Sequence, residues 1–210
     1  MSPSHADQAP VVAPRFHVEP ATPERWEDVT KVFGTRGDAS VCWCQWFTLN
    51  RLPLRRENAD LNKAGLERRV CQADGPPAGV LAYVDDVPVG WLRVGPVREL
   101  PRMLTSKAAG SALRPHAGDW MASCFVVRVG HRRRGVSKAL LEGGVELARA
   151  CGAPGILGHP LDIAALAGRR PAAADLYTGT LNIYLKAGFT EIARTLPHRA
   201  LVRLEFAPAR

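Results

Sequence analysis

The stretch "HRRRGVSKALLEG", residues 131–143, combines the residue types that bind phosphate groups in proteins. It lies between the apolar run "WMASCFVV" and a segment with helical spacing of apolar residues, which predicts a strand, a turn and a helix. The first N–H groups of a helix have no partner within it, and the helix dipole adds positive charge there. Gly135 would admit close backbone approach, and neighbouring Arg side chains would strengthen the hold on a pyrophosphate. The alternative is a solvated basic helix start.

Composition favours a soluble globular protein with acidic partners. The chain has 210 residues, 46% of them apolar, and 28 Lys and Arg against 20 Asp and Glu, a formal charge of +8. That balance suits phosphorylated cofactors, nucleic acid or anionic surfaces. The basic cluster is local and accompanies no helix-turn-helix or aromatic RNA platform, so nucleic acid is the less favoured partner.

Three further patterns bear on location. No apolar run approaches the roughly 20 residues of a membrane span, so we expect no membrane association. The first residues lack the pattern of a signal peptide. Five cysteines, an odd count without a repeating frame, indicate reduced thiols. We therefore expect a cytoplasmic protein.

The elements that must position the loop follow from periodicity and breakers. We expect a flexible tail at residues 1–14 and a single domain over 15–210. Strands are predicted near 16–19, in a hairpin over 79–95, at 120–127 and 155–159, and as a final pair over 190–206. Helices are predicted over 23–33, within 57–72, over 136–151 and over 180–187. Pro88 makes its strand an edge or irregular there. Alternating strands and helices predict an α/β or α+β fold with a mixed sheet.

Two motifs together resemble a known family. Arg132, Gly135 and Ser137 resemble the acyl-CoA signature of the GNAT family of N-acetyltransferases, with Ser137 as a small residue where Gly or Ala is usual. Further along, "LNIYLKAGF" resembles the closing motif of that family, whose Tyr falls on Tyr184. The resemblance spans roughly Val80 to Phe206. "CWCQW" and "GWLRVGP" also resemble a bacterial branch of the family.

The resemblance implies a GNAT-like acyl-CoA N-acyltransferase fold. Its twisted sheet, mixed but mostly antiparallel, has about seven strands flanked by helices, and its fourth and fifth strands splay into a V. The resemblance also implies acetyl-CoA as the cofactor, its pantetheine arm pairing with backbone near Cys124. The implied cofactor-binding residues are Phe125, Val126, Val127, Arg132, Arg133, Arg134, Gly135, Val136, Ser137, Lys138 and Tyr184.

Acetyl transfer from a thioester to an amine needs a free amine, an oxyanion donor and a proton for the thiolate. Tyr184 is the predicted acid, with a packed aromatic whose hydroxyl meets a carbonyl as the alternative. The backbone N–H of Phe125 or Val126 would polarise the thioester carbonyl. His159 ranks first as the base, ahead of His116 and a water chain. Asp119 and Asp162 are predicted to contact the substrate.

The aromatic loop offers a wall for the acceptor. Trp43, Trp46 and Phe47 are predicted to line that pocket, with simple core packing as an equal alternative. Cys42 and Cys44 invite a zinc interpretation, but a tetrahedral site needs four ligands and no second paired motif exists. An acetyl-carrying cysteine is a further alternative, although free Cys is commonly a small buried apolar residue.

The function predicted is an N-acetyltransferase that passes the acetyl group of acetyl-CoA directly to a primary amine. We expect a small-molecule amine, with protein Lys or N-terminal acetylation left open. The alternatives are an acyl-CoA-binding sensor without turnover and, less favoured, a basic nucleic-acid-binding protein. Members of the family are often dimers, so a homodimer is also considered.

Overall fold

The computed structural model of the protein describes residues 16–49, 55–72 and 74–207. The tail predicted at residues 1–14 lies outside these ranges. Within them, seven strands form one mixed sheet in the order β1-β2-β3-β4-β5-β7-β6. The strands are β1 (Phe16–Pro20), β2 (Gly79–Val84), β3 (Val87–Pro96), β4 (Trp120–Val127), β5 (Gly155–Gly158), β6 (Thr190–Leu196) and β7 (Arg199–Glu205). Every neighbouring pair is antiparallel except β4 and β5. The predicted fold class is confirmed.

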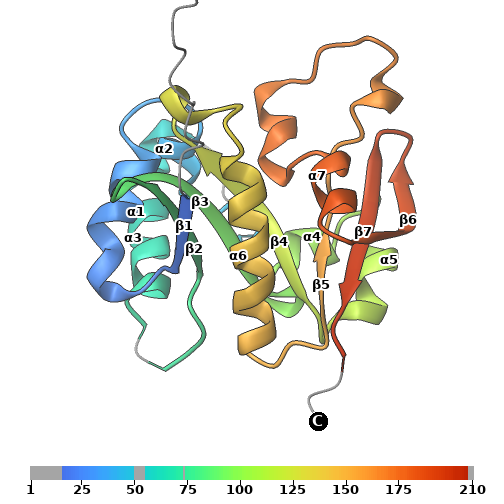
Figure 1. The fold of residues 1–210 in the computed structure, drawn as a ribbon, viewed down its shortest axis with the longest axis horizontal. Coiled ribbons are helices and arrows are strands. Elements are labelled where there is room, and N and C mark those ends of the chain that lie inside the picture. The colour runs from blue at the N-terminus through green and yellow to red at the C-terminus, as the bar shows by residue number, and fades with distance from the viewer. Residues whose placement is uncertain (1–15, 50–54, 73, 208–210) are drawn as a thin grey trace, which may run out of the picture.

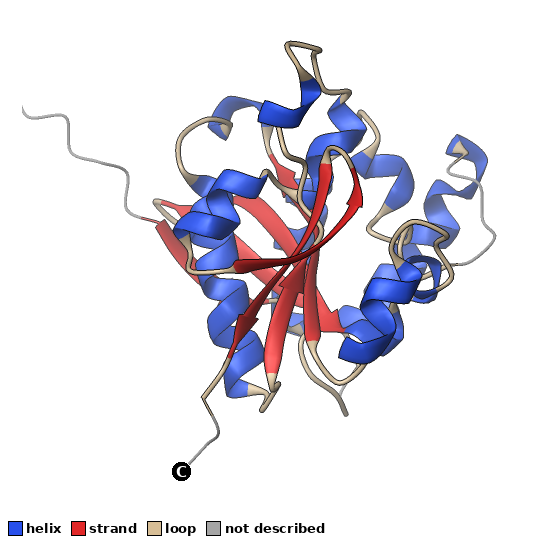
Figure 2. Ribbon diagram, turned by 90° about the vertical axis from the view of Figure 1, so that its right-hand side faces the viewer, coloured by secondary structure: helices blue, strands red, loops and turns tan. Residues whose placement is uncertain are grey.

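Helices cover both faces of the sheet (Figure 1). One face carries α1 (Trp26–Phe33), α2 (Ala39–Cys42), α3 (Ala59–Val70), α4 (Pro101–Leu104) and α5 (Gly110–Leu113), and the other carries α6 (Val136–Ala150) and α7 (Leu181–Lys186). Figure 2 shows the sheet between these two layers. Strand residues alternate between them, so Leu81 packs with the first layer and Ala82 with the second. The sheet therefore lies between two apolar cores.

Short 3₁₀ segments complete the connections. They are η1 (Pro23–Arg25), η2 (Arg56–Asn58), η3 (Val97–Glu99), η4 (Arg114–His116), η5 (Val129–His131), η6 (Ala164–Leu166) and η7 (Ala173–Thr178). Residues 96–118 and 161–179, where the sequence predicts a weakly periodic connection and an irregular one, contain η3, α4, α5, η4, η6 and η7. No helix in the described ranges is both long and apolar enough to cross a membrane.

Local chemistry explains the hairpin that carries β3 to the centre of the sheet. Asp85 and Asp86 join β2 to β3 with φ values of 48° and 62°, the left-handed pair of a tight hairpin turn. The register shifts between Ala82 and Tyr83, whose partners are Gly90 and Pro88, so Val89 is an extra residue. Pro88 thus lies beside a β-bulge in an internal strand, and the predicted irregularity is confirmed.

The sheet opens between β4 and β5. These strands pair only from Trp120 to Ala122 of β4, opposite Ile156 to Gly158 of β5. From Ser123 to Val127, β4 keeps β3 as a neighbour, and no strand of the described residues pairs with its other side. The predicted splay between the fourth and fifth strands is therefore present, with its vertex at Ala122 and Gly158.

Candidate functional site

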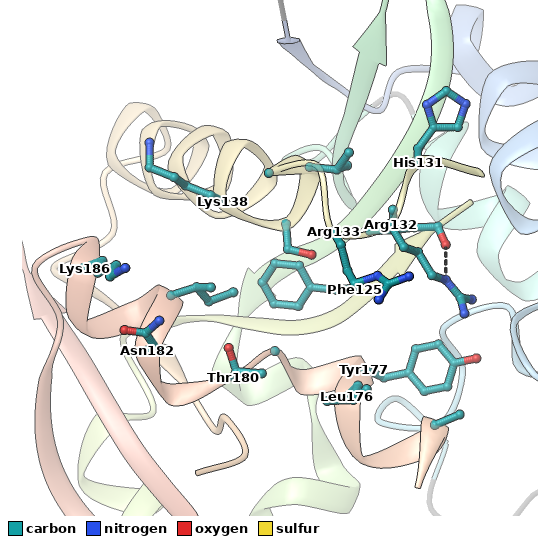
Figure 3. Close-up of a pocket in the computed structure, with 17 residues that line it drawn as sticks. Phe125, His131, Arg132, Arg133, Lys138, Leu176, Tyr177, Thr180, Asn182 and Lys186 are labelled. Carbon is teal, nitrogen blue, oxygen red and sulfur yellow. Dashed lines mark hydrogen bonds between the residues drawn. The ribbon is translucent and has the colours of Figure 1, made fainter. Parts of the chain in front are cut away.

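A cavity of about 820 Å³ opens where β4 leaves β5 (Figure 3). Its walls come from the end of β4, the turn before α6, the first turn of α6, η7 and α7. On the η7 and α7 side, eight lining residues were not predicted from the sequence as site residues: Ala173, Leu176, Tyr177, Gly179, Thr180, Asn182, Ile183 and Lys186. The cavity therefore joins the predicted anion-binding loop to η7, which carried no recognisable pattern, and to α7, whose motif marked only Tyr184 as a site residue.

The loop before α6 has the geometry of an anion site. Gly135 is the N-cap of α6 at φ 90°, a left-handed conformation that favours glycine, and Arg133 is left-handed at φ 59°. Lys138 and Ala139 donate their N–H groups to the Gly135 carbonyl, so the N–H groups of the two preceding helix residues have no partner within the helix. Those free N–H groups lie at the wall of the cavity.

Basic side chains surround these free N–H groups. Cavity-lining residues of the predicted loop are Arg132, Arg133, Gly135, Val136, Ser137 and Lys138, together with His131. Arg134 does not line the cavity. Lys186 adds a further positive charge from α7. Asn182 and Lys186 lie one turn apart on α7 and share its outer face, a helical spacing that the sequence displays without showing what it faces.

Backbone groups of β4 face the open side of the sheet. Arg128 donates its N–H to the Val89 carbonyl at 2.9 Å, which fixes which residues of β4 bond to β3. By the antiparallel alternation, the N–H and C=O groups of Phe125 and Val127 point away from β3 into the gap, whereas those of Val126 bond to β3. Arg132 Nε donates to the Val127 carbonyl at 3.1 Å. Both Phe125 and Val127 line the cavity.

Tyr184, the predicted acid, is fully buried at the vertex of the gap. Its hydroxyl lies 3.2 Å from the carbonyl oxygen of Ala122 and 3.3 Å from that of Thr178, so it donates its proton to backbone. Burial raises the pKa of Tyr184 far above its usual range. The residue does not line the cavity. This arrangement is the packed aromatic considered as the alternative, and the catalytic role stays a prediction.

His159, the predicted base, also lies outside the cavity lining. Its Nε2 is 2.6 Å from the hydroxyl oxygen of Thr195 on β6. Burial, and secondarily the charge of Arg199, lowers the pKa of His159 to about 4. An imidazole of this pKa is neutral at pH 7 but holds an abstracted proton poorly.

Asp119 and Asp162 are engaged in ion pairs. Asp119 is buried just before β4 and binds Arg203 of β7 through both oxygens, at 2.8 and 3.3 Å, with His116 at 3.2 Å. Asp162 accepts N–H groups at the start of η6 and pairs with Arg194 at 2.6 Å, which lowers the pKa of Asp162. Neither lines the cavity. Asp119 lies at the opposite end of β4, about 20 Å from Phe125 at strand spacing.

The aromatic loop packs mainly into the core that contains α1 to α5. Trp43 is buried and stacks on Phe33 with ring centroids 4.9 Å apart. Phe47 is buried, whereas Trp46 is exposed beneath the Arg102 guanidinium. None of the three lines the 820 Å³ cavity, although Trp43 borders a second cavity of about 560 Å³ beside α1 and α3. Their contact with an acceptor stays a prediction.

The cysteines of that loop are free, buried thiols. Trp91 donates its indole N–H to Cys44 Sγ at 2.9 Å, and Cys42 is buried nearby. Burial, followed by the neighbouring Cys44, raises the pKa of Cys42 to about 12, so its thiol stays protonated. Among the described residues, no group of three or more His, Cys, Asp or Glu is arranged to hold a metal ion.

Comparison with known proteins gives one family and one fold. The model of the acetyltransferase (GNAT) family matches residues 42–165. The GNAT domain of S. lividans PAT is similar in structure, with a TM-score of 0.55 and 18% identity over 95% of this chain and 100% of that chain. No curated protein matches the chain.

Two further similar structures were solved with a bound ligand. YncA from Salmonella typhimurium, solved with its cofactor acetyl-CoA, has a TM-score of 0.52 and 16% identity over 90% of this chain and 93% of that chain. PaiA N-acetyltransferase from Thermoplasma acidophilum, solved in complex with coenzyme A, has a TM-score of 0.52 and 11% identity over 91% and 99%. At these identities the likeness is one of fold.

Proposed function

The chain belongs to the GNAT acetyltransferase family, and on this premise we propose that it transfers the acetyl group of acetyl-CoA directly to a primary amine. The observation that carries the proposal is the composition of the cavity walls. The wall formed by the loop before α6 presents free helix N–H groups and basic side chains, and a second wall is the half of β4 that does not pair with β5. Acetyl-CoA combines a pyrophosphate with a long, slender arm that ends in a reactive thioester. The residues present fit such a molecule.

The pyrophosphate is assigned to the loop before α6. The N–H groups of Val136 and Ser137 would donate to phosphate oxygens, and Arg132, Arg133 and Lys138 would supply positive charge. Arg134 is not assigned, because it lies outside the cavity lining. Gly135 leaves the backbone open to close approach, since only Phe16 comes within 4 Å of where its Cβ would stand.

The pantetheine arm is assigned to the gap beside β4. Phe125 and Val127 would supply backbone groups to it, as a neighbouring strand does elsewhere in the sheet. The Phe125 N–H, rather than that of Val126, is the one available to polarise the thioester carbonyl. YncA and PaiA, which share the fold, were solved with acetyl-CoA and coenzyme A, and this supports the assignment.

The acceptor is proposed to be the amine of a small molecule. Trp43 and Phe47, buried aromatic residues after α2, belong to the same apolar core as Cys124 and Val126 on the opposite face of β4, and this enclosed, aromatic surrounding supports a small acceptor. An amine on a protein Lys or N-terminus is the other outcome of an acceptor panel. The free thiols support the proposed cytoplasmic location, and a homodimer stays a prediction.

A sensor that holds acyl-CoA without turnover is the second candidate. It is favoured by one observation: the predicted acid donates to two carbonyls and the predicted base has a pKa of about 4, both outside the cavity. If neither side chain reaches the reacting atoms and no water chain replaces them, bound acyl-CoA would not be turned over.

Calorimetry and turnover together test the proposal. The purified protein is titrated with acetyl-CoA, then mixed with a panel of small amines and Lys-containing peptides while acetyl-CoA consumption is followed. Binding with amine-dependent turnover is the expected result, binding alone identifies a sensor, and no binding contradicts both. In the same assay, a fall in kcat of a hundredfold or more for Tyr184→Phe, with acetyl-CoA affinity retained, would assign the acid to Tyr184.

A further inference from the structure

Tyr177, in η7, borders the gap between β4 and β5. Its ring lines the cavity on the α6 and α7 face, together with Phe125 and Val127. The same side chain packs against the apolar core of the opposite face, which contains Cys124 and Val126. Among the described apolar residues that line this cavity, it is the only one that also packs on that core. Tyr177 therefore stands where the two faces of the sheet communicate.

The surroundings of the Tyr177 hydroxyl agree with this placement. Three groups lie close enough to interact electrostatically with the phenol: Asp38 just before α2, Cys42 in α2 and Cys124 in β4. Arg132 interacts with it from the cavity side. In Figure 3, Tyr177 and Arg132 occupy one end of the cavity, and Lys138 and Lys186 the other.

The proton of Tyr177 is available. No described residue forms a hydrogen bond with its hydroxyl, in contrast to Tyr184, whose hydroxyl is held by two carbonyls. Burial, followed by the negative charge of Asp38, raises the pKa of Tyr177 to about 12. The phenol is thus protonated at neutral pH, and a free tyrosinate is disfavoured.

We propose that Tyr177 is the catalytic residue that relays a proton from the attacking amine to the departing thiolate, at the point where an acceptor from the α1–α5 face meets the thioester. This inference rests on the proposed function, since it concerns the same cavity and the same reaction. It assigns a role to a residue on η7 that no sequence motif marks.

The relay balances within the proposed reaction. The amine nitrogen bonds to the carbonyl carbon, the carbon–sulfur bond breaks, and sulfur keeps its electron pair. The Tyr177 hydroxyl passes its proton to the sulfur while it accepts the proton that nitrogen loses in becoming an amide. Because the two transfers are coupled, no free tyrosinate forms, and the raised pKa of the phenol is no obstacle. The products are an N-acetyl amine and coenzyme A with its thiol protonated.

Kinetics of Tyr177→Phe test the relay. We expect kcat to fall at least a hundredfold, with the dissociation constant for acetyl-CoA within threefold of wild type. Tyr83→Phe is the matched control, because it also loses a phenol but lies on β2, bonded to Asp28. Its kcat should stay within threefold of wild type. A Tyr177→Phe enzyme that turns over like the control would overturn the relay and leave the proposed function intact.

Thiol trapping tests the placement without requiring turnover. Tyr177→Cys is incubated with the disulfide form of coenzyme A, so that the new thiolate attacks it, forms a mixed disulfide and releases one coenzyme A thiol. Peptide mapping by mass spectrometry separates this adduct from any on the five native cysteines. Asn182→Cys, which also lines the cavity but lies toward Lys186, is the matched control.

We expect trapping at position 177 and at least tenfold less at position 182. No trapping at 177 overturns the placement, even where wild type acetylates amines normally. Trapping at 177 in a protein that acetylates no amine would contradict the transferase function and the relay together, while placing the sulfur beside η7. Loss of turnover in Tyr177→Phe combined with trapping at 177 supports the proposal.

Discussion

The ring of Tyr184 rests on Gly158, so closely that a Cβ on this glycine would come 2.1 Å from the ring Cε1. Gly158 is the last residue of β5 and the last to pair with β4. Because glycine leaves room for the ring, the Tyr184 hydroxyl reaches the Ala122 carbonyl across the vertex at 3.2 Å. The closed end of the gap is therefore a packed contact between α7 and the sheet.

Gly158→Ala should destabilise the protein. The added methyl group cannot be accommodated without moving the buried ring, and overpacking of this kind typically costs about 1–3 kcal/mol. Urea unfolding measures the loss. Gly118→Ala is the control, because nothing lies within 4 Å of its Cβ position, and it should change the free energy of unfolding by less than about 0.5 kcal/mol. Equal losses in both variants would contradict the packing described.

Gly135→Glu should abolish acetyl-CoA binding. The new side chain adds strain at φ 90° and negative charge beside the free N–H groups of α6. Gly152→Glu is a matched control at the other end of α6, where φ is 73° and nothing lies within 4 Å. Both variants should lose about 1–2 kcal/mol of stability, but only Gly135→Glu should lose affinity in calorimetry. If Gly135→Glu kept its affinity for acetyl-CoA, the assignment of the pyrophosphate to this loop would be wrong.

Arg132→Ala and Arg134→Ala separate two neighbouring arginines. Arg132 lines the cavity and should contribute a charge-assisted hydrogen bond, so its loss should weaken acetyl-CoA binding about tenfold or more. Arg134 lies outside the lining and should change affinity less than threefold. Calorimetry at low and high salt should show a weaker salt dependence for Arg132→Ala than for wild type. Equal effects would indicate a diffuse basic surface instead of a built site.

The buried histidine should make stability depend on pH. His159 has a pKa of about 4 in the folded protein, against about 6.5 when unfolded, so between these values the unfolded chain binds more protons. The contribution of the neutral imidazole to the free energy of unfolding is complete above pH 6.5 and is lost as the pH falls toward 4. The total loss is at most about 3 kcal/mol. Urea unfolding from pH 7 to 4.5 should show a shallower decline for His159→Asn. Parallel declines would place His159 in solvent.

Short, local sequence patterns predicted much of the fold. The Asp85–Asp86 turn, the β-rich run at 120–127 and the breakers Gly34, Gly152 and Gly188 act within a few residues, and the structure confirms the elements they bound. The loop around Gly135 was predictable for the same reason. By contrast, α4, α5 and η7 are single turns or 3₁₀ segments, too short to create a helical period in the sequence.

Long-range partners explain what the sequence could not indicate. The sequence shows Asp119 only as a carboxylate before a strand. In the structure it pairs with Arg203, which lies 84 residues later in β7. Tyr177 follows no motif, and its position in the gap depends on which two strands separate. Tyr184 matched a motif by position, but whether its hydroxyl faces a cavity or a carbonyl is decided by the packing of α7 on Gly158.

The pair formed by Asp119 and Arg203 has a mechanical meaning. Arg203 reaches over β5 at Gly155, where a Cβ would stand 3.0 Å from its guanidinium, and so ties the start of β4 to β7 across the strand between them. The gap between β4 and β5 is thereby held at its closed end, so any widening is expected at its open end. A ligand of greater thickness is therefore expected to be accommodated near Val127, while the strands at the closed end keep the same spacing for every ligand.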